Sequence, residues 1–177
     1  MSSRLVLGAV VSLVVLAGGG VPGARAEEHT IQATAPWTAR ARVFVTGARQ
    51  AFLQGVFSGN LSVQSAASTL DGASLVCPTV VEADYVANTT RGEGRCVITP
   101  RSGDRLFARW TCTGTPDQSC GGRFVLIGGT GAYQGVTGEG DFTLRMTLAE
   151  LTNLERMEAE YDLSGVAAWA ALTYRTP

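Results

Sequence analysis

Three observations predict an all-β protein. Segments enriched in Val, Ile, Phe and Thr alternate apolar and polar residues, which is the period of a strand with one buried face. Turn residues separate about eight such segments, at the spacing typical of a β-sandwich or a β-barrel. No convincing amphipathic helix of ten residues interrupts them.

The expected strands begin near Val43 and occupy most of the chain beyond it. Residues 50–63 form one long strand, or two strands that meet at Ser58-Gly59-Asn60, and residues 73–87 follow with a break at Cys77-Pro78. Further strands are expected at residues 94–99, 105–113, 123–127, 141–151 and 157–174. The last segment holds one strand, or two strands joined near Ser164-Gly165.

Residues 1–26 are expected to be a secretory signal peptide. Arg4 precedes an apolar run at residues 5–16, and the segment ends in Ala24-Arg25-Ala26, the small-residue exit of such peptides. The apolar run is shorter than the roughly 20 residues that span a bilayer. A retained membrane anchor is therefore the less favoured alternative, and we expect a secreted or periplasmic protein.

Residues 27–42 are expected to form a flexible N-terminal arm, and residues 43–177 a single β-domain. The arm contains Pro36 and the only histidine, His29. A lone histidine near a terminus is more often solvated than catalytic. Its position also removes the usual general base from serine and cysteine mechanisms.

The charge pattern argues against a nucleic-acid partner. All 14 basic residues are arginines, and two of them lie in the expected signal peptide, against 15 acidic residues. The arginines are scattered along the chain, whereas nucleic-acid binding depends on clustered positive charge. No second apolar run of 20 residues follows, so we expect no membrane association after cleavage.

A glycine-rich segment at residues 128–140 separates two apolar strands and invites a nucleotide-binding interpretation. That interpretation needs a helix after the glycines, whose N-terminal amides would hold a phosphate. Gly135, Gly138 and Gly140 oppose a helix, because each costs about 1 kcal/mol relative to alanine. A Walker-type loop also fails, because the chain has no lysine. The segment is expected to be a structural corner, and we expect no cofactor.

The same segment resembles a known family. Residues 124–142, FVLIGGTGAYQGVTGEGDF, are similar to the signature hairpin of the allene oxide cyclase and dirigent barrel superfamily. Residues 92–99 and 103–110 resemble secreted bacterial members with an allene-oxide-cyclase-like barrel, and the likeness extends over residues 43–174. The resemblance implies a closed, antiparallel eight-stranded barrel around a small-molecule cavity. Enzymes of that superfamily bind apolar, conjugated substrates and work by charge stabilisation and shape, but none of their catalytic residues can be matched to a position in this chain.

Four cysteines in an exported chain favour two disulfides. Cys112 and Cys120 flank turn residues between two expected strands, so a hairpin would bring them together. Cys77 would then pair with Cys96. A zinc site made of all four cysteines is the alternative, but neither close pair has the C-x2-C spacing.

Alternate residues of a barrel strand face its interior, which gives the candidate pocket residues. The expected polar groups near a barrel mouth are Arg109, Arg145, Asp141 and Glu93, and the aromatic candidates are Tyr85 and Trp169. Glu158, Glu160 and Asp162 form an acidic ladder on one face of the last strand. Adjacent carboxylates repel one another and prefer solvent, so this ladder is expected to be exposed.

Two classes of function follow. The favoured hypothesis is a secreted barrel that binds a small hydrophobic molecule inside, because Ala167, Ala168, Ala170 and Ala171, with Thr143 and Thr147, would leave room there. The alternative is a cyclase or isomerase that acts on an oxidised lipid or polyketide-like substrate. A subunit interaction module is a third hypothesis, and the sequence leaves a monomer and a homo-oligomer open.

Overall fold

The computed structural model describes residues 26–65, 68–116, 119–147 and 158–177, and the expected signal peptide lies outside this part except for Ala26. The described chain is all-β, apart from one three-residue 3₁₀ turn. Its elements are β1 (Glu27–Gly47), β2 (Gln50–Asn60), β3 (Ser62–Val63), β4 (Ser74–Asp84), β5 (Thr89–Thr99), β6 (Leu106–Gly114), β7 (Ser119–Gly129), η1 (Gly131–Tyr133), β8 (Thr137–Thr147) and β9 (Glu158–Thr176).

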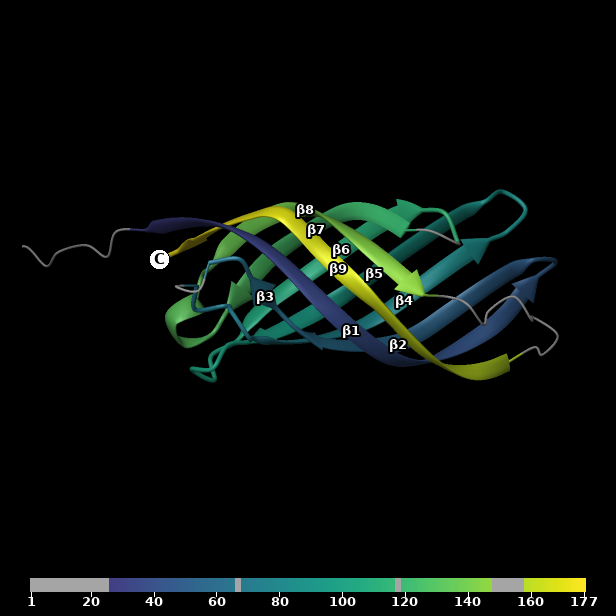
Figure 1. The fold of residues 1–177 in the computed structure, drawn as a ribbon, viewed down its shortest axis with the longest axis horizontal. Coiled ribbons are helices and arrows are strands. Elements are labelled where there is room, and N and C mark those ends of the chain that lie inside the picture. The colour runs from purple at the N-terminus through teal and green to yellow at the C-terminus, as the bar shows by residue number, and fades with distance from the viewer. Residues whose placement is uncertain (1–25, 66–67, 117–118, 148–157) are drawn as a thin grey trace, which may run out of the picture.

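Eight of these strands close into one antiparallel barrel, as predicted. Each strand pairs with the next along the order β2, β4, β5, β6, β7, β8, β9 and β1, and β1 returns to pair with β2. The short β3 pairs only with the N-terminal half of β1, outside the barrel. Figure 1 shows the strongly twisted strands wound around a long axis, with β1 and β9 crossing one side together.

The N-terminal segment corrects the sequence-based expectation. Residues 27–42 are not a flexible arm but most of β1, which pairs with β9 from Glu27 to Phe44. Inside this strand Ala33, Ala35, Trp37, Ala39 and Ala41 are buried, while the residues between them are exposed. Pro36 points outward, and the strand continues through it.

The cysteines pair as predicted. Cys77–Cys96 links β4 to β5, with Cα atoms 4.2 Å apart, and Cys112–Cys120 links β6 to β7, with Cα atoms 5.4 Å apart. The β4–β5 pairing skips Cys77 and Pro78 but keeps its register on both sides, which sets Cys77 opposite Cys96. Proline has no N–H for the ladder, so the disulfide joins the two strands where a backbone bond is missing. No cysteine is free, which excludes the zinc alternative.

The glycine corner joins the adjacent strands β7 and β8, and it contains only the 3₁₀ turn η1. Gly131 has a φ of 54°, and a Cβ there would lie 2.0 Å from the Asp104 carboxylate. That carboxylate accepts a hydrogen bond from the Ala132 amide at 3.3 Å. Glycine is therefore required both by the backbone conformation and by the close approach of Asp104.

The corner forms part of one closed end of the barrel. There Leu61, Leu70, Ala73, Tyr133 and Val136 are all buried. The segment between β2 and β4 folds over this end, with Asp71 Oδ1 accepting a hydrogen bond from the Val63 amide at 2.9 Å. The Tyr133 hydroxyl shares a hydrogen bond of 2.8 Å with Thr69 Oγ1. The opposite end, where β1 turns into β2 and β4 into β5, is called the mouth below.

Candidate functional site

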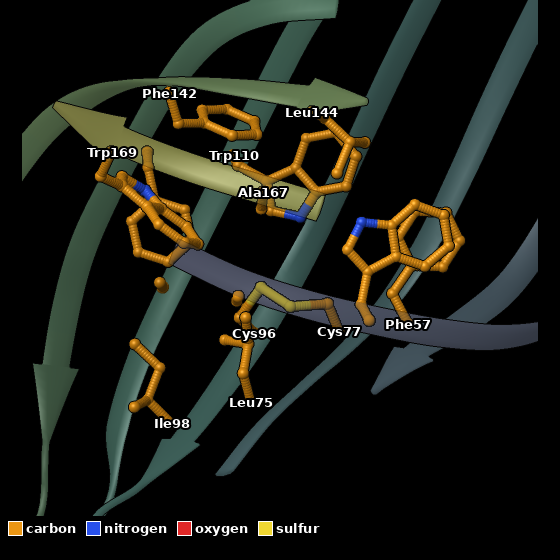
Figure 2. Packing of buried hydrophobic residues seen from close by; sticks show 14 of the residues in the cluster. Phe57, Leu75, Cys77, Cys96, Ile98, Trp110, Phe142, Leu144, Ala167 and Trp169 are labelled. Atoms are coloured by element: carbon orange, nitrogen blue, oxygen red, sulfur yellow. A yellow bond between two sulfur atoms is a disulfide. The ribbon is translucent and has the colours of Figure 1, made fainter. Parts of the chain in front are cut away.

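The middle of the barrel is filled by aromatic side chains. Trp110, Phe124, Phe142 and Trp169 form one cluster, with ring centroids 5.2 to 6.1 Å apart. Figure 2 shows Trp110, Phe142 and Trp169 grouped together, with the Cys77–Cys96 disulfide below them in this view. In the same core Trp37 stacks on Phe57, with centroids 4.2 Å apart. Aromatic pairs of this kind leave little space for a ligand at the centre.

The small residues that suggested a spacious interior do not line it. Ala167 is buried, but Ala168 is only half-buried and Ala170 and Ala171 are exposed. A bulge causes this change of face: Asp141 pairs with Ala171 and Phe142 with Trp169, so Ala170 is an extra residue in β9. Thr143 is exposed, and the side chain of Thr147 lies outside the described part.

The mouth holds a small apolar pocket instead. Its lining comes from β1, β2, β4, β5, β7, β8 and the β6–β7 connection, and its volume is about 40 Å³. The apolar side chains that form most of it are Val43, Leu53, Val81, Leu144 and Met146. A volume of roughly 10–15 Å³ holds one water molecule on this measure. The pocket can therefore hold a few atoms and is too small to enclose a whole drug-sized ligand.

One polar group in the mouth pocket has no partner. Thr90 is 8% exposed and lines the pocket, and its Oγ1 makes no hydrogen bond within the described part of the chain. Thr79, on the adjacent strand, is equally buried, but its Oγ1 donates to the Cys77 carbonyl at 3.0 Å. An unsatisfied buried hydroxyl costs about 1–3 kcal/mol. Thr90 is thus a buried hydrogen-bonding group in mainly apolar surroundings.

Two core indoles share this property but not this location. Trp37 Nε1 and Trp169 Nε1 are buried without a hydrogen-bond partner in the described residues. Neither side chain lines the mouth pocket. Of these unsatisfied groups, only the Thr90 hydroxyl therefore lies where a ligand entering from the mouth can reach it.

The aromatic candidates from the sequence lie in different places. Tyr85 is half-buried and lines the mouth pocket, at the end of β4. Trp169 is 3% exposed and belongs to the core cluster, so it does not line the mouth pocket. Sequence reasoning missed Thr90, Leu144 and Met146 as pocket residues. The alternation of apolar and polar residues along β8 places Leu144 and Met146 on its inward face, and this pattern could have identified these two.

The four charged candidates do not converge on the barrel interior. Arg109, Glu93, Arg145 and Asp141 are all exposed on the outer face. Arg109 and Glu93 line a broad groove on the outside of the sheet, and Asp141 pairs with Arg123 at 2.9 Å. None of these four candidates therefore lines the mouth pocket, although Arg145 lies at the mouth end of β8, opposite Ser119.

The acidic ladder of β9 is exposed, as expected. Its repulsion is offset by arginines of β1: Asp162 lies 3.3 Å from Arg40 Nε, and Glu158 pairs with Arg42. Such exposed pairs contribute little to stability, about 0–1 kcal/mol each.

Within the described ranges, the structure contains no group of three or more side chains suited to hold a metal ion. No helix in the same ranges is long and apolar enough to cross a membrane. The sequence matches no protein-family model, and no curated protein matches it significantly. The function must therefore be inferred from the site itself.

Proposed function

We propose that this protein is an exported binding protein that takes the apolar end of a small hydrophobic molecule into the mouth of its barrel. The observation that carries the proposal is the unpartnered Thr90 hydroxyl, buried in a pocket whose other inward groups are mainly apolar. Binding sites of this kind combine an apolar lining with a few polar groups that orient the ligand. The two disulfides and the expected signal peptide support the exported location.

The pocket selects the chemistry of its ligand. Its described lining has no carboxylate, arginine or histidine, so a charged group entering it would lose hydration without gaining a partner. Thr90 can donate one hydrogen bond to, or accept one from, a neutral polar atom. The best-fitting ligand is neutral, narrow at one end, and carries one carbonyl or hydroxyl close to that end. The rest of it would project beyond the mouth, because the cavity of about 40 Å³ is too small to enclose it.

The resemblance to allene-oxide-cyclase-like barrels agrees with a hydrophobic ligand and also motivates the cyclase or isomerase alternative. The described mouth lining supplies hydroxyl groups from Tyr85, Thr90, Thr115 and Ser119. It brings no acid and base together, and no cation there could stabilise a developing negative charge. The geometry therefore supports binding more than catalysis.

The substitution Thr90→Val separates stability from binding. Valine keeps the shape and removes the unsatisfied hydroxyl, so the free energy of unfolding is expected to rise by about 1 kcal/mol. The control Thr79→Val removes a hydroxyl that is already bonded, and it is expected to lower the free energy of unfolding by about 1 kcal/mol. Urea-induced unfolding of the three proteins measures both effects.

Ligand titration gives the functional half of the test. Acetophenone and α-methylstyrene have nearly the same shape, but only acetophenone has a carbonyl oxygen for Thr90. We expect the native protein and Thr79→Val to bind acetophenone more tightly, by about tenfold for one hydrogen bond of about 1.4 kcal/mol. Thr90→Val should bind both equally. Failure of the native protein to bind either compound, or the same preference in Thr90→Val, would overturn the proposal.

A further inference from the structure

The outer face of the barrel carries a groove that is separate from the mouth pocket. It runs across β9, β1, β2, β4, β5 and β6 and has a volume of about 790 Å³. This volume lies in the range of roughly 300–1,000 Å³ that is usual for small-molecule sites. Its charged side chains alternate along the strands with buried core residues, so they point away from the barrel interior.

Two arginines in this groove lie directly opposite each other. Arg95 and Arg109 are direct cross-strand neighbours on β5 and β6, and both side chains are exposed. Neither forms an ion pair or a side-chain hydrogen bond with a described residue. By contrast, Arg40 and Arg42, which line the other side of the groove, each pair with a carboxylate of β9. Like charges placed directly opposite each other destabilise a sheet, so this pair costs stability unless an anion lies between them.

The floor of the groove between the two arginine-bearing sides is partly apolar, although the exposed Gln54 of β2 also lines it, opposite Val80. Val56 is 46% exposed, and Pro78, its direct neighbour on β4, is also exposed. Val80 is half-buried beside them. A ligand held by Arg95 and Arg109 would therefore lay its adjoining part over a patch of aliphatic side chains. Burying that patch would be favourable by about 25 cal/mol per Å² of apolar surface.

We propose that Arg95 and Arg109 bind the oxyanion group of an amphipathic small molecule, whose apolar part lies over Val56, Pro78 and Val80. Guanidinium groups bind phosphate or sulfate through paired, charge-assisted hydrogen bonds. A doubly charged oxyanion between the two arginines would remove their mutual repulsion. Glu93, which also lines the groove, disfavours anions placed toward its end and so directs the oxyanion to the arginine pair. The site is separate from the mouth pocket, because the two have no lining residue in common.

Isothermal titration with two probes, 1-naphthyl phosphate and inorganic phosphate, tests both halves of the site. The native protein should bind 1-naphthyl phosphate at least about tenfold more tightly than inorganic phosphate, because the ring adds apolar contact. Arg95→Gln and Arg109→Gln should each weaken 1-naphthyl phosphate by about tenfold or more, since a hydrogen bond to a charged group is lost. Arg101→Gln, an exposed arginine outside the groove, is the matched control and should bind as the native protein does.

The midpoint temperature of thermal unfolding, measured without ligand, provides a second test. Removing one of two opposed arginines should leave the midpoint of Arg95→Gln unchanged or higher. Equal binding of 1-naphthyl phosphate by the native protein, Arg95→Gln and Arg109→Gln would overturn the proposal, and so would an equal loss in Arg101→Gln. A clear fall in the unfolding midpoint temperature of Arg95→Gln would also overturn it, because the two opposed arginines would then stabilise the unliganded fold. Binding of 1-naphthyl phosphate that survives in Thr90→Val distinguishes this site from the mouth pocket.

Discussion

Trp169→Ala is expected to lower the free energy of unfolding by about 3–5 kcal/mol, the range for removing a buried aromatic side chain. Trp169 is 3% exposed, and its ring lies 5.2 Å from Phe124 and 6.0 Å from Phe142, measured between centroids. The loss would therefore open a cavity in the centre of the barrel. It is a large part of the roughly 5–15 kcal/mol that stabilises a typical domain. Denaturant unfolding followed by tryptophan fluorescence and circular dichroism measures it.

Val166→Ala is the matched control on the same strand. Val166 lies three residues before Trp169 but points outward and is 41% exposed, so its loss should cost less than about 1 kcal/mol. If the two variants were equally stable, Trp169 would not be packed in a filled interior. The barrel would then have the spacious cavity that the sequence first suggested.

Replacing both Cys77 and Cys96 with alanine is expected to cost about 3 kcal/mol, the chain-entropy value for a loop of this length. The bridge lies in the core, where both cysteines are buried, so the substitution also removes packed sulfur atoms. Cys112 and Cys120 are 8 positions apart, so replacing both with alanine should cost slightly less, about 2.5 kcal/mol.

The free energies of unfolding of both double variants, measured in parallel with the oxidised native protein, test this expectation. Peptide mapping without reduction should find the 77–96 and 112–120 linkages and no free thiol. Equal stability of native protein and either double variant would contradict the structural role of that bridge. Any other pairing of the four cysteines would contradict the β4–β5 and β6–β7 registers.

The strands and the cysteine pairs were largely predictable from the sequence because their signals are local. On β8, Phe142, Leu144 and Met146 point inward and Thr143 and Arg145 outward, as the alternation indicated. On β6, Leu106, Ala108, Trp110 and Cys112 are buried for the same reason. The turn residues between Cys112 and Cys120 likewise predicted a hairpin, and with it the disulfide.

The first strand was missed because most of its inward residues are small. Four of its buried positions are Ala33, Ala35, Ala39 and Ala41, and alanine favours strands weakly. Pro36 also argued against a strand, although on β1 it sits at an exposed position. The period of two was present and would have found the strand, had alanine been counted as an apolar core residue.

The interior volume could not be predicted from the sequence. One bulge in β9 changes the face of Ala170 and Ala171, and no local pattern marks its position. The pocket residue Thr90 was equally hidden, because nothing in residues 89–92 distinguishes a threonine with a bonded hydroxyl from one without. Such properties depend on which strands meet, and so on the closed barrel as a whole.

The hydrophobic ligand is expected to bind in the mouth pocket and not in the barrel interior. A nuclear magnetic resonance titration of methyl-labelled native protein with acetophenone distinguishes the two locations. We expect shifts in the methyl resonances of the mouth residues Val43, Leu53, Val81, Leu144 and Met146, and none in Val56 and Val76 on the outer face. Shifts confined to the outer valines, or to buried residues that do not line the pocket, such as Ile31 and Leu172, would rule out the mouth pocket as the site.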